Sequence, residues 1–137
     1  MKYCILLFTL LMIQFGTVQA QEFDSEKNNY AVLSKNIQQL KPIILTANEL
    51  QLEHGSSYGD FIVIICGSTV KDISQNRDFE DLLEEAQKNH IAVYACGLSL
   101  EKFNVNIQRL PENLKITRNG ILYGLQLANK GFITLTI

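Results

Sequence analysis

Two uninterrupted apolar runs dominate the middle of the chain. Residues 61–66 and 91–96 are rich in β-branched side chains and show no alternation with polar residues. A strand of this kind is buried on both faces, as in a parallel sheet that helices cover. Shorter apolar runs predict three further strands, at residues 30–33, 114–117 and 132–137.

The segments between these apolar runs have the spacing of apolar residues that is typical of helices. Residues 37–53 place apolar side chains on one face, and Pro42 is tolerated only if the regular helix starts near Lys41. Asn76 or Ser74 is expected to cap a helix at 77–89, whose acidic residues form a solvated face. Its predicted inner stripe is Phe79, Leu82, Leu83 and Ala86.

Two more helices are expected in the last third of the chain. Ser99 is predicted to cap a short helix at 100–104, and Asn119 a helix that runs to Asn129 and is closed by Gly131. The stripe expected to face inward in the last helix is Ile121, Leu122, Leu125 and Ala128.

The alternation of strands and helices predicts an α/β fold, a three-layer sandwich with a five-stranded, mostly parallel sheet. One domain is expected at residues 30–137, preceded by a polar lead-in at 21–29. Ligand sites in such folds lie beyond the carboxyl ends of the strands.

The first twenty residues have the pattern of a secretory signal peptide. Lys2 precedes an almost wholly apolar run at residues 4–15, and Val18-Gln19-Ala20 offers small residues to a signal peptidase. We expect cleavage after Ala20 and a periplasmic or secreted protein with no later membrane segment. An uncleaved anchor is the alternative, although the run is short for a span of about 20 residues.

Composition excludes several function classes. The formal net charge is -2 with no basic block, which argues against nucleic-acid binding. Three cysteines and two histidines are too few for a zinc framework, so no metal site is expected. The chain contains no G-x-G-x-x-G, Walker or G-x-S-x-G motif, so nucleotide binding and hydrolase chemistry have no support.

The candidate chemistry lies at two strand ends, where Cys66-Gly67 and Cys96-Gly97 each follow an apolar run. Ser99 can start a helix just beyond Cys96. A thiol that faces a helix N-terminus meets partial positive charge and unpaired N–H donors, which favour the thiolate. The alternative is that each cysteine is simply a small buried apolar residue.

Several short motifs resemble the DsrE/DsrF-like family: Ile64-Ile65-Cys66-Gly67, Cys96-Gly97-Leu98-Ser99-Leu100, Asn119-Gly120-Ile121 and Lys130-Gly131-Phe132-Ile133. The resemblance implies a five-stranded parallel sheet and a homo-oligomer, a trimer or hexamer. It also implies that Cys96 accepts sulfane sulfur as a persulfide and passes it between donor and acceptor proteins, without a cofactor. Gly97 N–H and the Ser99 turn would stabilise the anion. No role carries over to Cys66.

Three functions therefore remain open. The chain could be a sulfur carrier that uses Cys96, or an oligomeric module that binds a small anion or a partner protein beside Cys96. It could also be a thiol–disulfide protein, because the resemblance implies that the strands ending in Cys66 and Cys96 are neighbours. Pairing requires both side chains on one face, and a one-residue offset would place them on opposite faces.

Overall fold

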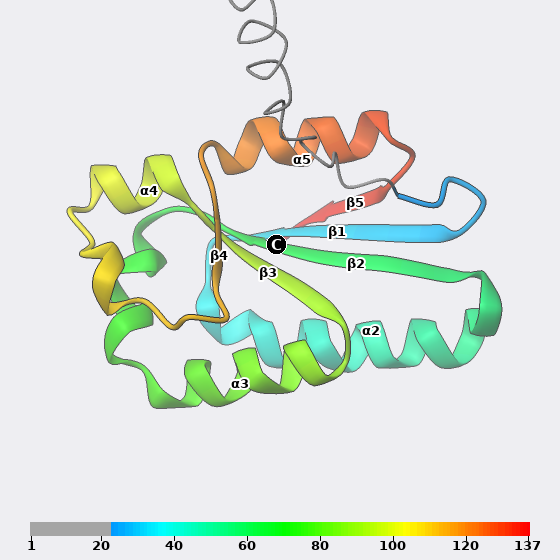
Figure 1. Cartoon of the computed structure of the whole chain (residues 1–137), viewed down its shortest axis with the longest axis horizontal. Coiled ribbons are helices and arrows are strands. Elements are labelled where there is room, and N and C mark those ends of the chain that lie inside the picture. Colours follow the sequence, from blue (N-terminus) through cyan, green and yellow to red (C-terminus); the bar gives the residue numbers. More distant parts are fainter. Residues whose placement is uncertain (1–22) are drawn as a thin grey trace, which may run out of the picture.

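The fold is built on a sheet of five parallel strands, in the order β4-β3-β2-β1-β5. The computed structural model describes residues 23–137 (Figure 1). The strands are β1 (Asn28–Ser34), β2 (Tyr58–Ile65), β3 (Ile91–Cys96), β4 (Lys115–Thr117) and β5 (Ile133–Thr136). The predicted α/β class and five-stranded sheet are confirmed, and every strand pairing is parallel.

Helices cover the two faces of this sheet unequally. α2 (Leu40–His54) and α3 (Arg77–Lys88) lie on one face, and α5 (Gly120–Asn129) lies on the other (Figure 1). α4 (Gly97–Lys102) leaves the carboxyl end of β3 directly. Four 3₁₀ segments join these elements: η1 (Ile37–Gln39), η2 (Gly55–Ser57), η3 (Ser68–Gln75) and η4 (Ile107–Arg109).

The larger core lies between the sheet and the α2/α3 layer. Asn76 caps α3 as predicted, because its side-chain oxygen accepts a hydrogen bond from Phe79 N–H at 3.0 Å. Phe79, Leu83 and Ala86 are buried against the sheet, while the acidic face of α3 is exposed. Burial of each large side chain stabilises the fold by about 1.5–3 kcal/mol.

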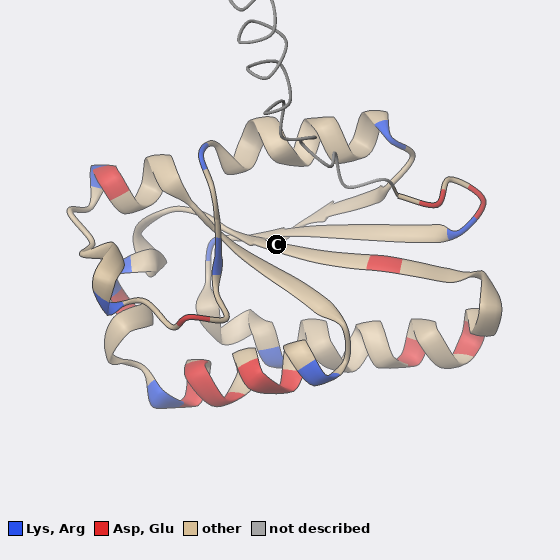
Figure 2. Cartoon of the chain, viewed as in Figure 1, with Lys and Arg blue, Asp and Glu red and all other residues tan. Residues whose placement is uncertain are grey.

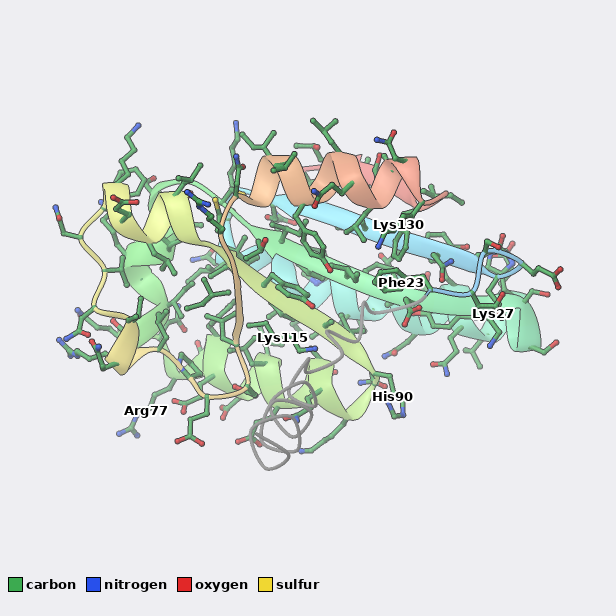
Figure 3. The ribbon with its side chains drawn as sticks, turned by 45° about the horizontal axis from the view of Figure 1, so that its top comes forward. Phe23, Lys27, Arg77, His90, Lys115 and Lys130 are labelled. Atoms are coloured by element: carbon green, nitrogen blue, oxygen red, sulfur yellow. The ribbon has the colours of Figure 1, made fainter. Side chains whose placement is uncertain are left out.

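The smaller core lies under α5. It contains Ala31, Ile62, Ile64, Cys66, Cys96, Leu127 and Phe132. Phe23 packs edge-on against Phe132 with ring centroids 5.0 Å apart, and the Lys130 ammonium lies 5.0 Å from the Phe23 ring centroid (Figure 3). The two cysteines therefore belong to the thinner layer of the sandwich.

The orientation predicted for the last helix is wrong, although its bounds and its Asn119 cap are correct. Gly120 and Leu127 are buried, and Gly124 lies against Leu33 and Ile64 of the sheet. The prediction assumed that the bulkiest apolar stripe faces the core. The helix instead packs on the sheet with the face that carries Gly120 and Gly124, because the lack of side chains there allows close approach. The predicted stripe of Ile121, Leu122, Leu125 and Ala128 is exposed.

Among the features that differ from prediction are two element boundaries and one connecting segment. α4 begins at Gly97, so Ser99 lies within its first turn and Cys96 occupies the N-cap position. β1 begins at Asn28, inside the expected lead-in at 21–29. It does so because Asn29 is buried and binds two carbonyls, with its oxygen accepting from Asp60 N–H at 2.8 Å. The η3 segment was not predicted.

The proposed signal peptide, residues 1–20, lies outside the described residues. Within residues 23–137, the structure has no helix with the length and apolar character needed to cross a membrane.

Candidate functional site

Cys66 and Cys96 lie side by side at the carboxyl edge of the sheet. β2 and β3 pair in parallel with Ile65 opposite Ala95, so the next residue along each strand is a cysteine at the same level. Both side chains enter the core under α5, where Cys66 is 6% exposed and Cys96 is 3% exposed. Both thiols are free. The alternative that they point to opposite faces is therefore excluded.

The sulfur of Cys96 is the focus of several hydrogen-bond donors. Gly120 N–H, at the start of α5, donates to Cys96 Sγ at 3.3 Å, and the Ser99 hydroxyl in α4 also favours the charged form of this sulfur. Burial acts to raise the pKa of Cys96, but these hydrogen bonds outweigh it, so that the pKa is lowered from its ordinary value of 9.0. The site favours a thiolate at this one sulfur.

Ser99 connects the two cysteine loops. Its Oγ accepts a hydrogen bond from Gly67 N–H at 2.9 Å, which leaves the hydroxyl proton free to point at Cys96. Gly67 has φ +82°, a conformation that favours glycine and turns the chain sharply after Cys66. The loop after β2 thus orients the hydroxyl that supports the thiolate after β3.

Gly97 has a structural reason for its identity. A Cβ at this position would lie 3.0 Å from Arg118 O and 3.1 Å from Thr117 O, so a side chain here would push this backbone away by a few tenths of an ångström. Leu98 N–H donates to Arg118 O at 3.1 Å, which fixes α4 against the segment before α5. Among the described residues, the donors to Cys96 are Gly120, Ser99 and Cys66, so the N–H predicted from Gly97 is not one of them.

Gly120 is the site residue that the sequence analysis missed. A Cβ there would lie 2.7 Å from Cys66 Sγ and 3.1 Å from Cys96 Cβ. Because Gly120 has no side chain, the first turn of α5 can pack directly against both cysteines. The available signal was the Asn119-Gly120 pair at a helix start. An N-cap followed by glycine offers unpaired N–H groups and close backbone approach at the same point.

Cys66 differs chemically from its neighbour. Burial, followed by the charge of Cys96 and the hydrogen bond that the Cys66 thiol donates to it, raises the pKa of Cys66 to about 12, and Lys35 opposes this only partly. The pKa of Cys96 is therefore lowered and that of Cys66 is raised, so Cys96 loses its proton before Cys66 does.

A cavity of about 380 Å³ is lined by residues of α4, the end of β4 and α5. Its walls include Leu98, Thr117, Arg118 and Asn119, the segment that packs over Gly97 and leads into Gly120. Neither cysteine lines this cavity, and Cys96 is buried. Arg118 is exposed here and supplies a positive charge.

No cluster of three or more His, Cys, Asp or Glu side chains placed to hold a metal ion occurs within residues 23–137.

Comparison with known proteins supports the fold and leaves function open. No family model and no curated protein matches the chain. A protein of unknown function from Methanobacterium thermoautotrophicum, MTH1491, superposes with a TM-score of 0.65 at 13% identity. The match covers 80% of this chain and 100% of the other. A conserved protein of unknown function from Bacteroides thetaiotaomicron, BT1422, gives 0.58 at 17% identity, over 80% and 95%. The chain shares their α/β fold.

Proposed function

We propose that the protein accepts and carries sulfane sulfur on Cys96. The observation that carries this proposal is the convergence of the Gly120 and Ser99 donors on one strand-end sulfur, which lowers its pKa. The resemblance to the DsrE/DsrF-like family supports the same activity. A thiolate is the nucleophile that sulfur transfer requires.

The reaction balances without a cofactor. The Cys96 thiolate attacks the sulfane sulfur of a donor, whose S–S bond breaks, and the donor's other sulfur leaves with the electron pair. Cys96 then holds a persulfide, stabilised as an anion by Ser99 and Gly120. An acceptor thiolate attacks the outer sulfur and regenerates the Cys96 thiolate. Donor and acceptor are thiol or persulfide proteins, or small sulfane compounds.

Intact-mass measurement tests this proposal. We expect the purified protein to gain the mass of one sulfur atom after incubation with glutathione persulfide, and to lose it to an added thiol. The experiment is done in a Cys4→Ser background, where Cys66 and Cys96 are the only thiols. Cys96→Ser is expected to abolish loading. Equal loading of that variant would contradict the proposal and leave Cys96 as a lining residue of a binding cleft.

We also propose that copies of the chain associate through an uncharged apolar surface on α5 and β5. Figure 2 shows no charged residue on either element. Leu125, Ile133 and Leu135 are 59–61% exposed, and β5 is an edge strand of the sheet. Ile133 and Leu135 pair with Tyr30 and Val32 and so face the α2 side of this edge strand, while Leu125 lies on α5. Exposed apolar side chains gathered at one edge of a sheet are typical of an interface. The family resemblance implies a trimer or hexamer.

We also propose that the protein is exported from the cytoplasm. If residues 1–20 are a signal peptide, the mature protein begins near Gln21 and works in the periplasm or outside the cell. N-terminal sequencing of protein purified from its native host is expected to start there. A soluble protein that retains Met1 would contradict export and would leave the Cys96 chemistry unaffected.

A further inference from the structure

The two cysteines are placed as partners for a covalent bond. Their strands are hydrogen-bonded neighbours in the same register, and neighbouring strands lie about 4.8 Å apart. Disulfides join Cα atoms that are about 4.4–6.8 Å apart, so this spacing suits one. Both side chains enter one core cluster, and the Cys66 thiol donates a hydrogen bond to the Cys96 sulfur.

The groups around the pair keep the two sulfurs together. Gly120 lies over both, with its Cα bare because a Cβ would meet Cys66 Sγ at 2.7 Å and Cys96 Cβ at 3.1 Å. Cys66 N–H donates to Ser34 O at 2.9 Å, which fixes the backbone of this residue just beyond the end of β2. A sulfur attached to Cys96 therefore has a second thiol as its neighbour from the moment it forms.

We propose that Cys66 is a resolving thiol, which attacks the inner sulfur of a Cys96 persulfide, forms a Cys66–Cys96 disulfide and releases hydrogen sulfide. This step rests on the carrier function proposed above. It gives Cys66 a role that the carrier function alone does not require.

The step is balanced within the protein. The bond between Cys96 Sγ and the outer sulfur breaks, and a bond between Cys66 Sγ and Cys96 Sγ forms. The outer sulfur leaves with the electron pair and is reduced to sulfide, while the Cys66 sulfur is oxidised to the disulfide level. The outer sulfur of the Cys96 persulfide anion takes the proton of the Cys66 thiol, so that Cys66 attacks as the thiolate and the outer sulfur leaves as hydrosulfide. No external oxidant takes part, and a dithiol reductant restores the two thiols.

Resolution and transfer then compete for the same persulfide. An acceptor that arrives first receives the outer sulfur and leaves Cys66 unchanged. When no acceptor arrives, the protein releases sulfide and is left as a disulfide that accepts no further sulfur. The pair thus limits how long a persulfide is held.

The test follows loaded protein over time without oxygen or added thiol. Protein in the Cys4→Ser background is loaded with glutathione persulfide, desalted, and sampled for released sulfide and for intact mass. We expect the added sulfur to disappear, one equivalent of sulfide to be released, and the protein mass to fall by two hydrogens below that of the reduced chain. Peptide mapping is expected to join Cys66 to Cys96.

Two variants at Cys66 provide the comparison. Cys66→Ser and Cys66→Ala, each checked for folding by its thermal unfolding curve, are expected to load at Cys96 and keep the persulfide, with sulfide release reduced at least about tenfold. Release from both variants at the rate of the parent protein would overturn the resolving role, as would a parent protein that keeps its persulfide. In both cases the carrier function stands. Failure of the parent protein to load at all would overturn both proposals.

Discussion

The two faces of the sheet are built from different kinds of helix. α3 carries a charged outer surface and a buried stripe of Phe79, Leu83 and Ala86, so its orientation is fixed by its own amphipathic pattern. α5 has no charged residue, packs its glycine face on the sheet, and leaves Ile121, Leu122 and Leu125 exposed. Cys66 and Cys96 lie in the core under α5. The larger core and the proposed functional site therefore lie on opposite faces of the sheet.

The largest expected loss of stability comes from removing a large buried side chain from the core between α3 and the sheet. Phe79 is 1% exposed and fills the space between α3 and the sheet. Phe79→Ala is expected to lower the free energy of unfolding by about 3–5 kcal/mol, measured by denaturant titration. Leu122→Ala, on the exposed side of α5, is the matched control and is expected to change it by less than about 0.5 kcal/mol. Equal losses in the two variants would contradict the division between the layers.

A smaller effect is expected where α5 meets the cysteines. Gly120→Ala forces a methyl group against Cys66 Sγ and Ile64, which is expected to destabilise the protein by about 1–3 kcal/mol. Because α5 must lift to make room, its N–H moves away from Cys96 and the pKa of that thiol is expected to rise. Gly131→Ala is a control for the thiol titration alone: nothing lies within 4 Å of its added Cβ, but its φ of +88° strains the backbone and lowers stability by itself. A Gly120→Ala protein with unchanged stability and thiol titration would place α5 farther from the sulfurs than described.

The smallest effect on stability is expected at the exposed surface of α5. Leu125→Gln should change the free energy of unfolding of the monomer by less than about 0.5 kcal/mol, because Leu125 is already 61% exposed. Sedimentation at micromolar concentration is expected to show an oligomer for the parent protein and smaller species for this variant. Glu84→Gln on the exposed face of α3 is the matched control. A parent protein that sediments only as a monomer would refute the proposed assembly.

The sequence predicted the layer architecture because its signals are strong there. The bounds predicted for the third strand, 91–96, and the Asn119 cap of α5 agree with the structure, since uninterrupted apolar runs and N-cap residues are local signals. The local sequence pattern could not predict which face of α5 contacts the sheet, because a helix that is apolar all round presents several equivalent stripes. The glycine spacing of Gly120 and Gly124 was the remaining clue to its contact with the sheet.

The candidate site was predicted in part, for a related reason. Cys96, Ser99 and Cys66 are adjacent to strand ends, and the fold brings such residues to one edge. The donor from Gly120 comes from a segment 24 residues away in the chain, so only the packing of α5 reveals it. Gly97 was given an anion-binding role, whereas the structure shows it accommodating the backbone of Thr117 and Arg118.

The central claim is that Gly120 and Ser99, at the starts of two helices, lower the pKa of the Cys96 thiol. Its most direct test is the titration of this thiol by the ultraviolet absorbance of the thiolate, taken as the difference between the parent protein and Cys96→Ser. We predict a midpoint below the ordinary value of 9.0, and a higher midpoint in Ser99→Ala, which loses the hydroxyl. A midpoint at or above 9.0 in the parent protein, unchanged by Ser99→Ala, would contradict the claim.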